Sequence, residues 1–155
     1  MAKRLLVLFL GNILRGDDGV GIELLKRVSN KIMPDNVKLE EGSTGGMILL
    51  GIFKDYEKLL IVDAIDTGDY SKDVVIFSPS DIFDDAHNVF SLHSIGIIDV
   101  LRLSKRLEEK IPEVTIFGIQ VRDTSEHIGL SPAILKILND LEERLYRLIL
   151  ELSRA

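Results

Sequence analysis

A glycine-rich segment at residues 11–21 (GNILRGDDGVG) constrains the fold of this chain more than any other stretch. It follows a nearly uninterrupted apolar run at residues 4–10. It precedes a segment from Val20 onward in which apolar residues recur at helical spacing. A strand, a glycine-rich turn and a helix in this order predict a binding loop at the carboxyl edge of a parallel sheet.

The side chains of this loop favour a cation over a phosphate group. Phosphate-binding loops use free backbone N–H groups and the positive end of the following helix. This loop carries two carboxylates, Asp17 and Asp18, and its one cation is Arg15. Its glycines also do not follow the order of the dinucleotide-binding fingerprint. Two carboxylates repel a pyrophosphate and suit a metal ion, so we interpret the segment as a phosphate-loop-like scaffold rebuilt for a cation.

Composition narrows the class of protein. A chain of 155 residues is long enough for one ordinary domain, which we assign to residues 1–155. The absence of cysteine excludes disulfides, thiolate metal sites and a cysteine nucleophile, and it fits a reducing compartment. The net charge of −6 argues against a nucleic-acid partner, and no apolar run approaches the roughly 20 residues of a membrane span. We therefore expect a cytoplasmic protein that binds neither nucleic acid nor membrane.

Hydrophobic periodicity predicts an α/β fold. Apolar runs predict five strands, at residues 4–10, 36–41, 58–65, 72–77 and 114–119. Helices are predicted at residues 20–32, 47–53, about 91–109 (starting at Ser91 or Ser94) and 132–152. The first helix should bury Val20, Leu24, Leu25, Val28 and Ile32, and the last should bury Ile134, Leu138, Leu141, Leu145 and Leu148.

The connection at residues 64–71 fixes the direction of the fourth strand. It is shorter than the roughly dozen residues that a right-handed crossover needs, so this strand should run antiparallel at an edge of the sheet. The predicted architecture is a three-layer α/β/α sandwich whose five-stranded sheet is mostly parallel, with one antiparallel edge strand.

Three residues that are distant in the sequence are predicted to meet at one edge of this sheet. Asp18 follows the first strand, Asp63 ends the third, and His93 opens the helix before the last strand. Loops at the carboxyl ends of parallel strands share an edge, and the amino end of a helix keeps an imidazole neutral. Two carboxylates and one imidazole form a site with open positions that suits a catalytic divalent cation.

Each of these residues also has an ordinary structural interpretation. Asp17 or Asp18 is well placed to cap the following helix, and His93 alone is typical of a capping or surface histidine. For Asp63 we favour a functional interpretation, because burying an unpaired carboxylate at the end of an apolar run costs several kcal/mol. His127, in the later polar loop, is a ligand, a substrate contact or a plain loop residue, of which we favour the last two.

With GNILRGDDGVG, IVDAID and SLHSIGIIDVL in that order, the chain resembles the hydrogenase maturation endopeptidases. These proteins remove a short C-terminal extension from the large subunit of nickel–iron hydrogenases. The resemblance covers nearly the whole chain and includes EGSTGGMILLG at residues 41–51 and EHIGLSP at residues 126–132.

The resemblance implies a site and a partner. The family's metal-binding acid, its strand-end aspartate and its histidine fall on Asp18, Asp63 and His93, and the implied ion is nickel, already held by the [NiFe] hydrogenase large-subunit precursor. It further implies cleavage by water, with the metal polarising the peptide carbonyl or activating the water, and no side-chain nucleophile. The loops at residues 42–46 and 126–127 are candidates for holding the precursor tail.

Two other functions stay open at this point. A nucleotide-binding α/β protein is the first, because Glu40 or Glu41 ends the second strand about where a ribose-binding acid belongs. A scaffold that binds nickel or the precursor without cutting it is the second.

Overall fold

The computed structural model describes residues 3–42, 54–78, 90–91, 106 and 110–154. Strands β1 (Leu5–Phe9), β2 (Val37–Glu41), β3 (Lys58–Asp66), β4 (Val74–Phe77), β5 (Phe90–Ser91) and β6 (Glu113–Gln120) join one sheet. The main path runs β2-β1-β3-β6-β4, and β5 pairs with β3 beside it. The pairs along β2-β1-β3-β6 are parallel and β4 runs antiparallel to β6 at the edge, so the sense predicted for the fourth strand is confirmed.

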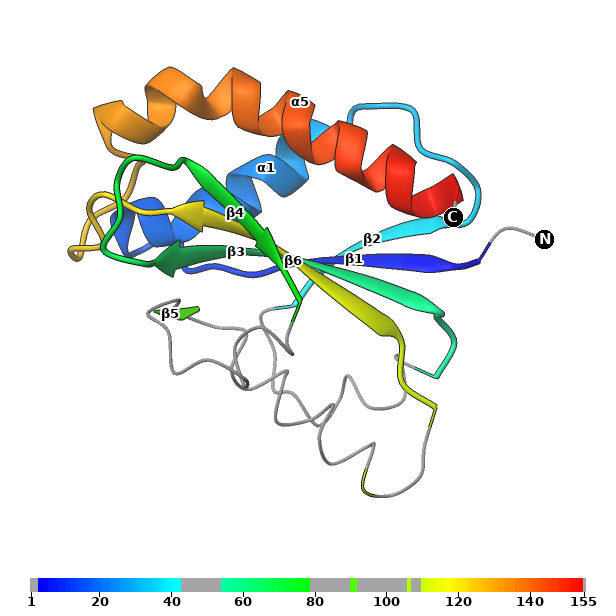
Figure 1. The fold of residues 1–155 in the computed structure, drawn as a ribbon. Coiled ribbons are helices and arrows are strands. Elements are labelled where there is room, and N and C mark those ends of the chain that lie inside the picture. Colours follow the sequence, from blue (N-terminus) through cyan, green and yellow to red (C-terminus); the bar gives the residue numbers. More distant parts are fainter. Residues whose placement is uncertain (1–2, 43–53, 79–89, 92–105, 107–109, 155) are drawn as a thin grey trace.

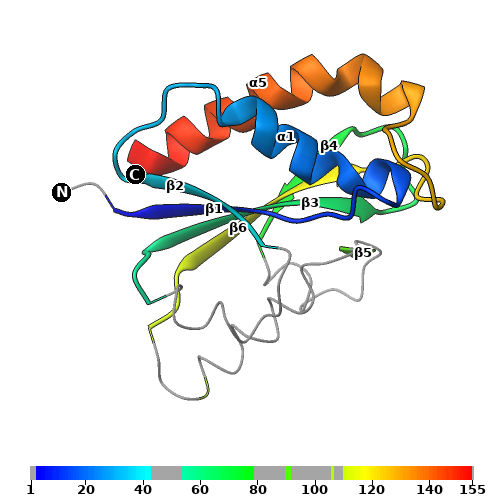
Figure 2. The same cartoon turned by 180° about the vertical axis from the view of Figure 1, so that it is seen from behind.

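Two helices cover one face of the sheet. The short helix η1 (Gly16–Gly19) leads directly into α1 (Val20–Val28), and α5 (Pro132–Arg154) crosses the same face (Figures 1 and 2). This arrangement confirms the predicted α/β class and its mixed sheet. The predicted helix at residues 47–53 lies outside the described residues. A helix starting at Ser91 is wrong, because Ser91 belongs to β5, and the alternative start at Ser94 lies outside the described residues.

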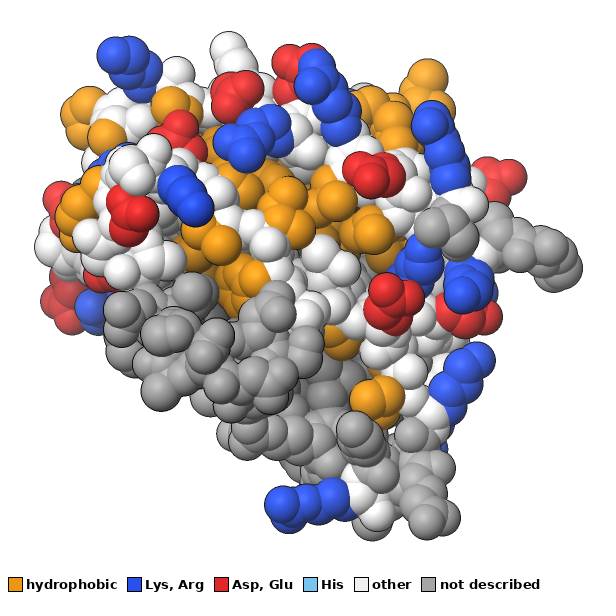
Figure 3. All heavy atoms as spheres, viewed as in Figure 1, with side chains coloured by type: hydrophobic (Ala, Val, Ile, Leu, Met, Phe, Trp, Pro, Cys, Tyr) orange, Lys and Arg blue, Asp and Glu red, His pale blue; other side chains and the backbone are white. Residues whose placement is uncertain are grey.

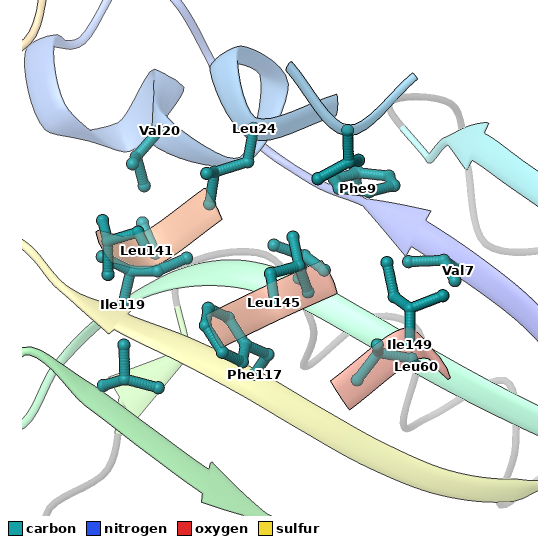
Figure 4. Close-up of a cluster of buried hydrophobic side chains, with 14 of the residues drawn as sticks. Val7, Phe9, Val20, Leu24, Leu60, Phe117, Ile119, Leu141, Leu145 and Ile149 are labelled. Carbon is teal, nitrogen blue, oxygen red and sulfur yellow. The ribbon is translucent and has the colours of Figure 1, made fainter. Parts of the chain in front are cut away.

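Strand β1 is apolar along its whole length because it is buried on both faces of the sheet. All five residues of β1 are buried, and alternate residues join different hydrophobic clusters on the two faces of the sheet. On the helical face, α1 and α5 pack against the strands (Figure 4). The side chains that meet there are Val7 and Phe9 of β1, Leu60 of β3, Phe117 and Ile119 of β6, Val20 and Leu24 of α1, and Leu141, Leu145 and Ile149 of α5.

The ends of the helical stripes differ from the prediction. Helix α1 ends at Val28, and Ile32 is 87% exposed, so its predicted burial is wrong. The side chains of Ser29 and Asn30 both donate to the carbonyl of Lys26, which gives the backbone an alternative to further helix.

Helix α5 follows the predicted stripe up to its last turns. Ile134, Leu138 and Leu141 are buried as predicted, and so is Leu145. The stripe then continues through Ile149, while Leu148 is only partly buried.

A cluster of charges joins α1 to α5. Glu142 accepts an ion pair from Arg27 at 3.3 Å and another from Lys31 at 3.2 Å. Burial opposes the charge of Glu142, but hydrogen bonds from Lys31 and Arg27 outweigh it and hold the pKa of this carboxyl below its ordinary value of 4.5. The ionised form is therefore favoured by the fold.

This cluster predicts a pH-dependent contribution to stability. Because the pKa of Glu142 is lower in the folded chain than in the unfolded chain, its contribution is complete above pH 4.5 and is lost as the pH falls through the folded pKa. We expect Glu142→Gln to lower the free energy of unfolding by about 0.5–1 kcal/mol at neutral pH. Urea unfolding of both proteins at pH 7 and pH 3.5 measures this, and a difference that does not shrink at the lower pH contradicts it.

Charges on the described surface are mixed. Basic and acidic side chains alternate over the face seen in Figure 3, without a large patch of one sign. Two ion pairs along α5, Asp140–Arg144 and Glu143–Arg147, contribute to this pattern. Within the described part of the chain, no helix is long and apolar enough to cross a membrane.

Candidate functional site

Close backbone contacts hold Asp18 at the carboxyl end of β1. The backbone N–H of Asn12 donates to the carbonyl of Asp18 at 3.3 Å and to its Oδ2 at 3.2 Å. A Cβ added at Gly11 would lie 2.5 Å from the carbonyl oxygen of Asp18, so only glycine permits this approach. The loop therefore closes on itself around Asp18, whose side chain is buried.

Asp63 occupies the corresponding position on the neighbouring strand. Phe9 of β1 pairs with Val62 of β3, so Asp63 is one residue beyond the end of the β1 pairing. It lies opposite Gly118 of β6 and is fully buried. By alternation its side chain belongs to the face opposite α1 and α5.

Asp18 therefore lies in the loop after β1, and Asp63 lies in β3 just beyond the point where its pairing with β1 ends. Residues of η1 and β3 approach within 8 Å of each other between Cα atoms. Asp18 is 2% exposed and Asp63 is 0% exposed. Removing two carboxylates from water is costly unless their charge is balanced. Carboxylate oxygens are among the ligands that divalent cations bind in proteins.

The third predicted residue, His93, lies outside the described residues. The strand that precedes it is described: Ser91 pairs with Ile65 and Phe90 pairs with Asp66. Strand β5 therefore brings the chain to β3 two residues beyond Asp63, at a point two residues before His93 in the sequence. No group of three potential metal ligands occurs among the described residues, so the three-residue site remains a prediction.

The capping role considered for Asp17 and Asp18 is wrong. Gly19 is the N-cap of α1, and no side chain caps the first turn of either η1 or α1. Asp17 is instead fully buried, and its carboxylate accepts four hydrogen bonds from residues 122–131. Sequence reasoning missed this role because the partners lie 105 to 114 residues away in the chain.

The polar loop that carries His127 lies against the first loop. Arg15 and His127 form an isolated parallel bridge, and the N–H of Gly16 donates to the carbonyl of His127 at 2.8 Å. An open hollow of about 440 Å³ lies between the two loops. Its lining is Asn12, Leu14, Arg15, Glu126, His127 and Ile128. Leu14 is 58% exposed and Ile128 is 77% exposed, so each loop contributes one solvent-exposed apolar side chain to a hollow whose other lining residues are polar or charged.

The two acids at the end of β2 lie at the surface of the protein. Glu40 forms an ion pair with Lys38 at 3.4 Å, and Glu41 is an exposed side chain. The loop where a pyrophosphate would bind contains the buried carboxylates Asp17 and Asp18. The glycine-rich loop at residues 43–46 lies outside the described residues.

Comparisons with known proteins agree with one another. The model of a family described as hydrogenase maturation protease matches residues 22–148. The hydrogenase 2 maturation protease of Escherichia coli is 32% identical over 133 residues, covering 84% of this chain and 81% of the relative. The solved structure of the E. coli hydrogenase maturating endopeptidase HybD superposes with a TM-score of 0.79 at 29% identity, covering 96% of this chain and 93% of that one. The [NiFe] hydrogenase maturation protease HybD from Thermococcus kodakarensis gives 0.77 at 29% identity, with 94% and 99% covered.

Proposed function

This chain belongs to the hydrogenase maturation protease family, and on that premise we propose that it is an endopeptidase that removes the C-terminal extension of a nickel-loaded [NiFe] hydrogenase large-subunit precursor. One of the similar solved structures is a hydrogenase maturating endopeptidase, which supports this reaction. The other is a [NiFe] hydrogenase maturation protease, which supports this partner. The absence of cysteine is consistent with our placing of the reaction in the cytoplasm.

One observation carries the proposal. Two buried carboxylates lie near the carboxyl end of β1: Asp18 in the loop that follows this strand, and Asp63 in the neighbouring parallel strand β3, one residue beyond its pairing with β1. Structural acids are rarely buried in pairs, because each must be compensated for its lost hydration. Two carboxylates this close to the end of β1 supply oxygen ligands of the kind that a divalent cation delivered by the substrate would bind.

We assign a role to each residue. Asp18 and Asp63 bind the nickel carried by the precursor through oxygen atoms, and His93 binds it through its neutral imidazole. A bound divalent cation supplies the Lewis acidity that polarises a peptide carbonyl or activates water. The protein in turn balances the charge of the ion and orients the scissile segment beside it, and no side-chain nucleophile takes part.

Processing in vitro tests this function directly. We expect the purified protein to shorten a nickel-loaded large-subunit precursor by its C-terminal extension and to leave the nickel-free precursor intact, because the metal brings the peptide to the two acids. Intact mass measurement of the large subunit before and after incubation gives the answer. Binding of the loaded precursor without any shortening would instead support the non-catalytic scaffold, and equal cutting of both precursors would exclude recognition through nickel.

A further inference from the structure

Asp17, the residue before Asp18, connects the first loop to a segment more than a hundred residues later. Its Oδ2 accepts the backbone N–H groups of Arg122 at 2.9 Å and Asp123 at 2.8 Å. Its Oδ1 accepts the N–H of Ser131 at 2.7 Å, and its Oδ2 accepts the hydroxyl of Ser131 at 2.9 Å. Figures 1 and 2 both show the segment between β6 and α5 lying beside η1.

The contact with Ser131 extends to the most firmly packed helix. Ser131 precedes Pro132, the first residue of α5, and its hydroxyl also accepts the N–H of Ile134 at 3.4 Å. The carboxylate of Asp17 thus sits at the amino end of a 23-residue helix, where a negative charge is stabilised. Since a buried stripe fixes α5 to the sheet, Asp17 has a rigid support on that side.

The two segments that Asp17 joins differ in how they are held. The first loop closes through its own backbone, with Asp18 N–H donating to Arg15 and Arg15 N–H donating to Asn12, each at 3.1 Å. Residues 122–131 contain one local turn, in which the hydroxyl and N–H of Ser125 donate to Asp123. Both ends of the segment are bound by the carboxylate of Asp17, which accepts hydrogen bonds from residues 122, 123 and 131. Backbone N–H groups of Gly16 and Asp17, which donate to the carbonyls of His127 and Asp123, and the Arg122 side chain, which contacts Tyr70 and Asp73, add to this attachment.

We propose that Asp17 is a positioning residue for substrate binding. It fixes residues 122–131 so that Glu126, His127 and Ile128 form one wall of the hollow beside the Asp18 loop, with Leu14 on the other side. Exposed apolar side chains on both sides, Leu14 and Ile128, beside polar groups that can hydrogen-bond a backbone, suit an extended peptide, which under the proposed function is the precursor tail. Asp17 itself touches no reacting atom, so it acts on the affinity for the precursor and not on the chemical step.

Asp17→Asn separates affinity from chemistry. The amide keeps one oxygen that accepts hydrogen bonds. Its NH₂ group replaces the other oxygen and cannot accept hydrogen bonds from the N–H and O–H donors that face it. We expect KM for the loaded precursor to rise about tenfold with kcat within about twofold of the parent. We also expect amide hydrogen exchange in residues 122–131 to accelerate at least about tenfold while η1 and α1 keep their parent rates.

A matched variant and a milder one complete the experiment. Asp69→Asn changes a carboxylate that likewise accepts the N–H and hydroxyl of a serine, Ser71, but in an exposed local turn, and it should alter neither KM nor exchange at residues 122–131. Ser131→Ala removes one of the four contacts and should give a smaller change of the same kind. In the double variant with Asp17→Asn, Ser131→Ala should change KM and exchange by less than it does alone, because both substitutions remove the same contact between Asp17 and Ser131.

Three outcomes would overturn the proposal. They are unchanged exchange at residues 122–131 in Asp17→Asn, a loss confined to kcat, and faster exchange spread evenly over the whole chain. The exchange measurement uses the free protein and so does not depend on cleavage. If the parent protein fails to cut the precursor, the proposed function fails, while exchange at residues 122–131 still decides whether Asp17 fixes this segment.

Discussion

Replacing Asp63 with asparagine is expected to abolish processing of the precursor while the protein stays folded. Asparagine has nearly the same shape as aspartate but lacks its charge, so the site loses the group that we assign to the metal. Changes to residues that only support a metal ligand typically cost 10- to 100-fold, so loss of a ligand should lower kcat/KM by at least about 100-fold. Because Asp63 is fully buried, a neutral amide carries a smaller desolvation cost there, and the melting temperature should not fall by more than a few degrees.

The control for this experiment lies on the same strand. Asp66 is exposed, and its Oδ1 accepts hydrogen bonds from Gly68 and Gln120 that an asparagine oxygen would still accept. Asp66→Asn should therefore process the precursor at the parent rate. Cleavage by the two variants is compared on nickel-loaded precursor, with thermal unfolding of each measured in parallel. An Asp63→Asn protein that matures the precursor normally would refute the assignment of Asp63.

The sheet could be predicted from the sequence because its strands are buried in characteristic ways. Strand β1 and the first half of β3 are buried on both faces, so each has a continuous apolar run, at residues 5–9 and 59–62. The direction of β4 followed from chain length alone, since its connection from β3 is too short for a crossover. Strand β5 escaped prediction because two residues carry no periodic pattern, and its pairing with Ile65 and Asp66 is a tertiary contact.

For the candidate site, too, some features could be predicted from the sequence and others could not. The prediction that Asp18 and Asp63 lie close together follows from a general rule about parallel sheets, because loops at the carboxyl ends of parallel strands share an edge. In the structure Asp63 lies within β3, just beyond the point where its pairing with β1 ends. The role of Asp17 could not be found in this way. Local reasoning treats an aspartate before a helix as a cap, but the four donors of residues 122–131 are available only in the folded chain and outweigh that local preference.

Gly21→Ala should lower the free energy of unfolding, against the usual effect of such a change in a helix. Alanine favours a helix over glycine by about 1 kcal/mol, so propensity alone predicts stabilisation. In this chain an added Cβ at residue 21 would lie 2.2 Å from the carbonyl oxygen of Leu10 and 3.2 Å from that of Val62. Both obstacles are backbone atoms, one just after β1 and one in the middle of β3, and they cannot rotate away, so α1 must move off the sheet. We expect a net loss of about 2–3 kcal/mol, near the upper end for an overpacked core.

The same displacement should reduce processing, because Asp18 lies three residues before Gly21 and Asp63 directly follows Val62. Moving α1 away from the strand ends therefore separates the two acids as well as weakening the fold. Urea unfolding and precursor cleavage are measured on Gly21→Ala and on Lys26→Ala, which places alanine at an exposed position of the same helix and should match the parent in both. A Gly21→Ala protein as stable as the parent would mean that helix propensity, and not contact with the strand ends, governs this position. The close approach of α1 to the strands would then make no measurable contribution to the free energy of unfolding.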